Sequence, residues 1–389
     1  MRLSKVILPI IVIAQFCCTS LWFASNAVIN DLVTNYPLEQ NALGHLTTAI
    51  QFGFIIGTLL FALFTIADRF SPSNVFFLSA LLGAFCNMCL LFDNQTFISL
   101  FTLRFLTGFF LAGIYPIGMK IATDYYQKGL GKSLGFLVGA LVLGTALPHL
   151  LKEILSDFSW KHVVLTTSVL SLLGGISMLI FVPNGPYRKA GTGLDLSVCF
   201  SVFKHIPFRQ AAFGYFGHMW ELYAFWTFVP ILLKAYANSH QNTHFNIPLL
   251  SFFIIAIGAI SCVLGGCLAE KIGTKKVAFS ALLLSCICCI CCPLLFFVGS
   301  ESLFIAFLLF WGMVVIADSP LFATLVAQNT PAKEKGTALT IVNCIGFAIT
   351  IISIQLLGSL VHFSSSILVF LVLAIGPILG LIALRKSKL

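Results

Sequence analysis

The feature that most constrains this chain is a series of twelve apolar stretches, each close to the length of a bilayer crossing. They lie near residues 6–29, 44–66, 75–92, 97–119, 131–152, 162–182, 209–233, 248–269, 276–298, 302–326, 337–360 and 365–384. Only 9% of the residues are charged, against about 25% in a soluble domain. Because a backbone in lipid must satisfy its own hydrogen bonds, such segments cross as helices. We therefore predict an all-α membrane protein with twelve transmembrane helices.

The longest connection, residues 183–207, divides these spans into six and six. Pro183 and Pro186 interrupt helix formation there. The sequence therefore predicts an N-terminal bundle over residues 1–182, a cytoplasmic linker over 183–207 and a C-terminal bundle over 208–389.

The two predicted bundles resemble each other in sequence. Five matches occur in the same order at offsets of 202 to 205 residues: Trp22 with Trp226, Asp68-Arg69 with Glu270-Lys271, Gly108 with Gly312, Pro116 with Pro320, and Gly131 with Gly336. Because six crossings are an even number, the repeats run parallel, related by an axis along the membrane normal. We expect two six-helix pseudo-repeats, and the repeat indicates that a monomer suffices for function.

The net charge of +9 follows from 22 basic and 13 acidic residues. Eighteen of the basic residues fall in connections on the side of the N-terminus and three on the opposite side. This bias predicts that both termini are cytoplasmic, and it accounts for the positive charge without a nucleic-acid partner. The compact chain with short termini favours a bacterial inner membrane.

The sequence shows no feature of an enzyme. It has no nucleotide-binding loop, no helix-borne H-E-x-x-H and no extramembrane stretch long enough for a catalytic domain. Most of the 13 cysteines lie inside apolar runs, which favours buried apolar side chains over disulfides or metal ligands. We predict no enzymatic activity, no cofactor and no metal site.

Two related loops carry paired acids and bases. The loop between spans eight and nine contains Gly266, Glu270, Lys271, Gly273 and Lys275, and its counterpart in the first half contains Asp68 and Arg69. A carboxylate near a helix end accepts hydrogen bonds from exposed N–H groups and pairs with a cation.

The loop over residues 266–276 is similar to the signature G-x-L-a-D-R-x-G-R-K of the major facilitator superfamily, with Glu in place of Asp and Lys in place of Arg. Arg104 and Gly108 in span four also resemble the R-x-x-x-G pattern of that family. The resemblance implies a secondary transporter that works by alternating access. It also implies that both loops belong to the cytoplasmic gate and that substrate binds near the midplane between the two halves.

Ionisable residues inside the spans are the first candidates for coupling, because each costs about 2.5–3.5 kcal/mol to place at a helix centre. Glu221 lies half-way along span seven, and His218 shares its helix face three residues earlier. Asp318 directly precedes Ser319-Pro320 in span ten. We predict Glu221 as the principal proton-coupling residue, with His218 and Asp318 as further candidates. A static ion pair of Glu221 with Arg104 or His218 is the alternative.

Polar and aromatic side chains in the spans are candidates for substrate binding. In span one they recur at i, i+4, i+7 and i+11, and other spans add further members: Gln15, Thr19, Trp22, Asn26, Gln51, Arg104, Tyr115, Trp220, Tyr223, Trp226 and Asn343. Amides facing lipid would lack partners, so they are expected to point inward. Arg104 would serve as counter-ion to Glu221 or to an anionic substrate group. Interhelical hydrogen bonding alone, or a structural role for Arg104, remains the alternative.

The combined interpretation is proton-coupled uptake of a small organic solute by symport. The expected partners are that solute, protons and the lipid bilayer. A proton-coupled drug or metabolite exporter working by antiport is the alternative, and a transporter-like receptor or a channel is a more distant one.

Overall fold

A computed structural model describes residues 3–39, 41–126, 130–188, 201–240, 243–331 and 334–385. All regular structure in these ranges is helical, which confirms the predicted all-α class. The chain divides into two compact units, Met1–Leu194 (unit 1) and Asp195–Leu389 (unit 2). The division lies inside the predicted linker, of which residues 189–200 fall outside the described residues.

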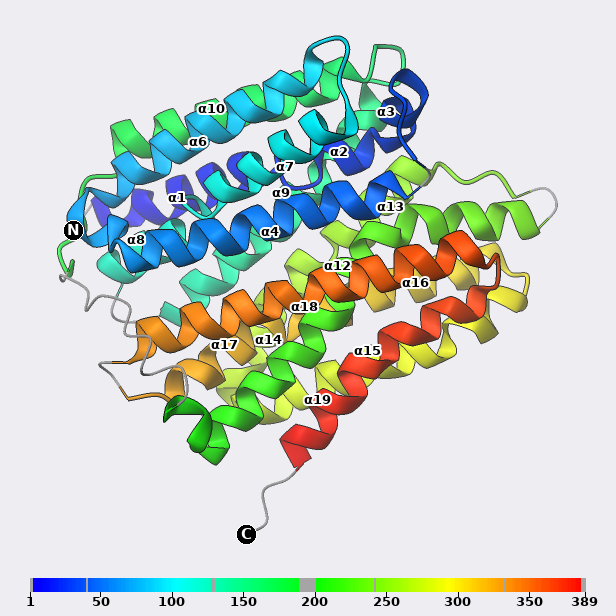
Figure 1. Ribbon diagram of the computed structural model, residues 1–389. Coiled ribbons are helices and arrows are strands. Elements are labelled where there is room, and N and C mark those ends of the chain that lie inside the picture. The colour runs from blue at the N-terminus through cyan, green and yellow to red at the C-terminus, as the bar shows by residue number, and fades with distance from the viewer. Residues whose placement is uncertain are drawn as a thin grey trace. The chain divides into compact units, whose positions relative to one another are not determined.

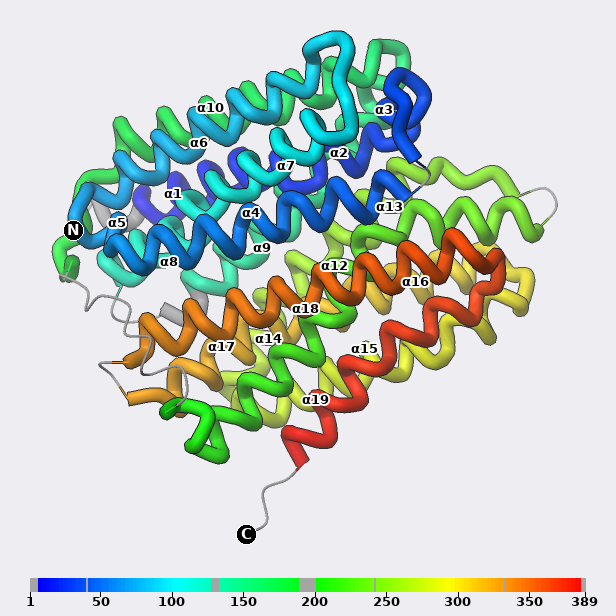
Figure 2. The backbone as a smooth tube through the Cα atoms, viewed as in Figure 1, coloured from blue at the N-terminus to red at the C-terminus, as the bar shows by residue number. Residues whose placement is uncertain are grey.

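Unit 1 is built from long apolar helices and several short segments that join them (Figure 1). Their bounds are α1 Leu3–Thr19, α2 Ala24–Ala27, α3 Ile29–Asn35, α4 Ala42–Leu63, α5 Ile66–Arg69, α6 Pro72–Met88, η1 Cys89–Leu91, α7 Phe97–Leu111, α8 Tyr115–Tyr125, α9 Leu130–Ile154 and α10 Lys161–Phe181. Helices α6 and α10 pack side by side, as do α4 and α7. Figure 2 shows the path of the backbone through the short helices α2 and α3, in blue near the N-terminus.

Unit 2 repeats this plan. Its elements are η2 Val202–Lys204, α12 Ile206–Ser239, α13 Ile247–Ala256, α14 Gly258–Ile272, α15 Thr274–Phe297, α16 Glu301–Ala317, α17 Ser319–Gln328, α18 Lys335–Phe363, η3 Ile367–Ala374 and α19 Ile375–Arg385. The long α12 packs against α18 and α19, while α16 packs against α14 and α15. Helix α12 also contacts α16, so side chains of α12, α15 and α16 can meet.

The described helices follow the positions of the predicted spans, but only ten are both long and apolar enough to cross a bilayer. The remaining two predicted spans correspond to α1 and α12. Helix α1 is short, with 17 residues, because it ends at Thr19 before the break that precedes α2. Helix α12 has 34 residues, and polar groups such as His218 and Glu221 lower its mean hydropathy.

The predicted repeat is visible where helices break. Helix α7 ends at Leu111 and α8 begins with Tyr115-Pro116, while α16 ends at Ala317 and α17 begins with Ser319-Pro320. A proline has no N–H for the preceding turn and is best tolerated at the start of a helix. The two matching prolines therefore break the corresponding span of each unit at the same place.

Two glycines mark the matching close contacts of the repeat. A Cβ atom at Gly108 of α7 would collide with the carbonyl oxygen of Ile50 in α4, and one at Gly312 of α16 with that of Ile254 in α13. The two contacted residues, Ile50 and Ile254, are 204 positions apart, and so are Gly108 and Gly312. Small residues allow membrane helices to approach this closely.

Adding a methyl group at Gly312 is expected to destabilise unit 2. The change Gly312→Ala forces α16 away from the backbone of α13, at a cost of about 1–3 kcal/mol, and lowers the melting temperature of the purified protein. Gly266→Ala is the matched control, because no atom lies within 4 Å of a Cβ placed there. Equal melting temperatures for the two variants would contradict the close contact.

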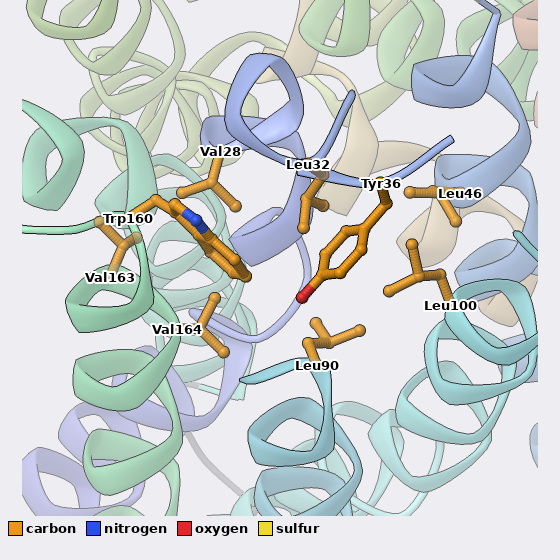
Figure 3. Close-up of a cluster of buried hydrophobic side chains, with 9 residues drawn as sticks. All are labelled: Val28, Leu32, Tyr36, Leu46, Leu90, Leu100, Trp160, Val163 and Val164. Carbon is orange, nitrogen blue, oxygen red and sulfur yellow. The ribbon is translucent and has the colours of Figure 1, made fainter. Parts of the chain in front are cut away.

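A cluster of buried side chains fixes the start of unit 1 (Figure 3). Its members are Val28, Leu32, Tyr36, Leu46, Leu90, Leu100, Trp160, Val163 and Val164. The Tyr36 and Trp160 rings meet edge to face with centroids 6.4 Å apart, and the Tyr36 hydroxyl donates to the Phe92 carbonyl at 3.1 Å. The cluster holds α3 against the first turns of α7 and α10.

Candidate functional site

Glu221 lies on α12 and is 1% exposed. Its Oε1 atom accepts a hydrogen bond from the Trp311 indole Nε1 of α16 at 2.6 Å and another from the Ser285 hydroxyl of α15. Neither donor was among the predicted site residues, because nothing in the sequence shows that α15 and α16 pack beside Glu221. Their presence on neighbouring helices shows that three elements of unit 2 meet at this carboxyl group.

His218 and Asp318 form the second polar contact of unit 2. The His218 Nδ1 atom lies 2.8 Å from Asp318 Oδ1, and both side chains are 1% exposed. The sequence placed His218 beside Glu221 on one helix face, but the structure pairs it with Asp318. Asp318 is the residue between α16 and α17, so the imidazole contacts the chain where this span is broken.

Within the described residues, neither buried carboxyl group has a lysine or arginine partner. The ion pairs of the described residues are Lys120–Asp68, Lys152–Asp31, Lys161–Asp93 and His218–Asp318. The group formed by Glu221, His218 and Asp318, here called the acid cluster, therefore contains two carboxyl groups and one imidazole. Without protons it would carry two negative charges, so two protons make it neutral.

The other predicted residues of α12 and α18 have partners in unit 2. The Trp220 indole donates to the Val372 carbonyl at 2.9 Å, and Asn343 accepts from the Tyr215 hydroxyl at 3.0 Å. The rings of Tyr223 and Trp226 lie 5.4 Å apart. Tyr215 was not predicted, although it lies one turn before His218 on α12.

The predicted polar stripe of unit 1 is buried. Gln15, Thr19, Trp22, Asn26 and Gln51 are each at most 5% exposed. Thr19 donates to the Gln15 carbonyl at 2.8 Å, Asn26 donates to the Thr47 hydroxyl at 2.9 Å, and the Trp22 ring lies 5.0 Å from that of Phe54. Within the described residues, the side-chain amide atoms of Gln15 and Gln51 lack hydrogen-bond partners. These two amides are the members of the stripe with unused donors and acceptors.

Arg104 of α7 is fully buried and has its hydrogen-bonding partners in unit 1. Its Nη1 donates to Asn87 Oδ1 at 3.2 Å, and its Nη2 donates to the carbonyls of Leu21 and Trp22 at 3.0 and 2.6 Å. Those carbonyls lie at the break between α1 and α2, so Arg104 satisfies acceptors that a continuous helix would satisfy itself. Tyr115, predicted on the same stripe, begins α8 and is half-buried.

The first of the two predicted gate loops is held by several contacts. Asp68 forms an ion pair with Lys120 of α8 at 2.8 Å, and the Arg69 Nε donates to the Thr65 hydroxyl at 3.1 Å. Arg188 donates to the carbonyls of Asp68 and Phe70, both at 2.8 Å. The start of the predicted linker is therefore attached to this loop.

In the second predicted gate loop, the acid and the base that follow the motif are exposed. Glu270 and Lys271 are exposed, and Gly273 joins α14 to α15 with a φ of 98°, which only glycine adopts without strain. Lys275 donates to Gln210 of α12 at 3.3 Å, and open space surrounds Gly266. The loop thus presents its charges to solvent at the ends of α14 and α15.

Comparisons with known proteins agree with this architecture. The model of the family described as Major Facilitator Superfamily matches residues 11–354. A comparison with curated protein sequences finds no match. Among solved structures, the chain is similar to the MFS proton:xylose symporter XylE bound to 6-bromo-6-deoxy-D-glucose, with a TM-score of 0.76 and 13% identity, over 98% of this chain and 95% of that one.

Proposed function

We propose that this chain, which belongs to the major facilitator superfamily and has the fold of its transporters, takes up a small organic solute by proton symport. The supporting observation is the acid cluster of Glu221, His218 and Asp318, which is buried in unit 2 and has no lysine or arginine partner in the part of the chain that the structure describes. The similar solved structure is that of a proton:xylose symporter, which is consistent with proton coupling.

The acid cluster supports proton coupling because its charge depends on bound protons. A buried carboxylate without a cation is costly in a medium of low dielectric constant. Binding a proton removes that charge, and releasing it restores the cost. A conformational equilibrium that buries the cluster more in one state than in the other therefore shifts with proton binding.

The two carboxyl groups of the acid cluster also favour a second candidate function, which is export of a solute by proton antiport. A cationic solute would neutralise the cluster as a proton does, so its binding would displace a proton. Symport and antiport then differ in whether solute and proton occupy the protein together or in turn.

The remaining features of the proposal follow from the sequence. We infer that both termini are cytoplasmic from the distribution of basic residues, and we infer a bacterial inner membrane from the compactness of the chain. We also infer a monomer without cofactor or enzymatic activity, in which the two units alternate access to the solute.

The proposal predicts solute-driven proton movement. Proteoliposomes containing the purified protein and an internal pH dye would be exposed to pools of amino acids, organic acids, nucleosides, sugars and cationic drugs. We expect one pool to acidify the interior, in a manner absent from protein-free liposomes. Alkalinisation would support antiport instead, and uptake of a pool without proton movement would contradict coupling.

A further inference from the structure

The hydrogen bond from Trp311 to Glu221 constrains which carboxyl oxygen carries the proton. Trp311 Nε1 donates to Oε1 at 2.6 Å, and an indole N–H has no acceptor capacity. Oε1 must therefore remain an acceptor in both protonation states. The carbonyl oxygen of a protonated carboxyl group is a better acceptor than its hydroxyl oxygen, so this bond favours the form of protonated Glu221 in which Oε1 is the carbonyl oxygen and the proton lies on Oε2.

Ser285 does not impose the same constraint. Its hydroxyl also lies at Oε1, but a hydroxyl can donate or accept and can rotate to suit the carboxyl group. Only Trp311 fixes the direction of its hydrogen bond. The Cys289 thiol of α15 also forms a hydrogen bond with Glu221, and a thiol, like a hydroxyl, can donate or accept. Among these three neighbours, the indole is therefore the one that selects the oxygen.

The indole is held in place by its own packing. Trp311 is fully buried and stacks on Phe225 with centroids 4.3 Å apart and an interplanar angle of 29°. The Phe307 ring lies 5.7 Å away, and the adjacent Gly312 packs on the backbone of Ile254. Turning the N–H away from Oε1 would disrupt these contacts, so the bond persists when the proton is exchanged.

We propose that Trp311 is the positioning residue of the coupled proton: it holds Oε1 as an acceptor, so that the proton binds and leaves at Oε2 of Glu221. This inference rests on the proposed proton coupling. A hydrogen bond to an ionised acceptor is roughly twice as strong as one between neutral groups. Deprotonation of Glu221 therefore strengthens the attachment of α16 to α12, and α16 is the helix that ends directly before Asp318.

Several other ionisable groups lie near Glu221, but the indole of Trp311 donates its hydrogen bond to Glu221 itself. Asp318 interacts electrostatically with Glu221 and is itself paired with His218 of α12 at 2.8 Å. Helix α15 contributes the thiols of Cys286, Cys288 and Cys289, which interact electrostatically with Glu221. No basic side chain is among the described partners of Glu221. A change at Trp311 is therefore expected to act on proton binding at Glu221 directly.

The test is an infrared pH titration of the purified protein in lipid nanodiscs, in which the carbonyl stretch of the protonated carboxyl is followed. The Glu221→Gln variant identifies the Glu221 band by its loss. Trp311→Phe keeps an aromatic ring but removes the donor. We expect its Glu221 carbonyl band to move to higher frequency, because Oε1 has lost a hydrogen bond. We also expect the titration midpoint to rise by about one pH unit, tenfold in proton affinity, because the ionised form loses a donor.

Trp160→Phe, a buried tryptophan of unit 1, is the matched control and should leave both readouts unchanged. An unchanged Glu221 band and midpoint in a folded Trp311→Phe protein would overturn the inference. If that variant does not fold, the wild-type band decides: a frequency typical of a carbonyl without hydrogen bonds would overturn it as well. If the Glu221 carbonyl band shifts as expected in Trp311→Phe but transport by the wild-type protein does not depend on protons, the proposed function is refuted while the positioning role of Trp311 stands.

Discussion

Glu221→Gln is expected to abolish proton-driven accumulation of the solute while leaving solute exchange across the membrane intact. Glutamine matches the shape of a protonated glutamate and can still accept from Trp311 and Ser285 at Oε1, so the packing of α12, α15 and α16 is preserved. It cannot release a proton. The variant therefore remains permanently in the neutral condition of Glu221, and the accumulation ratio falls to the value reached by passive equilibration.

The measurement compares two assays on the same proteoliposomes, using the pool that drives proton movement in the wild-type protein. Uphill uptake under an imposed pH gradient should be lost, while exchange of external for internal solute at equal pH should continue at a similar rate. Ser285→Ala is the matched control, because it removes one neighbour of Oε1 and retains the titratable carboxyl group. Undiminished uphill uptake by Glu221→Gln would exclude Glu221 as the coupling residue.

The location of most helices could be predicted because lipid permits little else for long apolar stretches. The breaks at Pro116 and Pro320 follow from the missing N–H of proline. The break between α1 and α2 could not be predicted, since residues 20–23 include Leu21, Trp22 and Phe23 and contain neither proline nor glycine. It depends on Arg104, which is 83 residues away from Leu21.

The candidate site was predictable only in part. Glu221 and Asp318 stand out because ionisable groups are rare inside membrane spans. Their partners depend on which helices pack together, and a spacing of three residues along α12 could not show that His218 faces Asp318. Trp311 could have been noticed as an indole N–H that needs an acceptor when buried, but its acceptor comes from a helix 90 residues earlier.

Arg104→Gln is expected to destabilise unit 1 strongly. The guanidinium connects α7 to Asn87 of α6 and to the Leu21 and Trp22 carbonyls at the break between α1 and α2. Asn87 in turn donates to the Thr167 and Ser168 hydroxyls of α10 at 3.2 and 3.0 Å. A glutamine side chain is shorter and has two donor hydrogens, so it cannot serve all three acceptors. Each buried acceptor left unpaired costs about 1–3 kcal/mol, and we expect a large fall in melting temperature and in the yield of folded protein.

Arg104→Lys tests whether the fork of donors or the charge alone is needed. A lysine retains the positive charge but presents its donors from a single point, so we expect it to recover only part of the lost stability. The sequence also allowed Arg104 to be a counter-ion for Glu221 or for an anionic substrate. In that case Arg104→Gln would lose transport while melting at the wild-type temperature, and Arg104→Lys would restore activity. If Arg104 instead stabilises the break between α1 and α2, both variants melt at a lower temperature than the wild-type protein, and Arg104→Gln shows the larger loss.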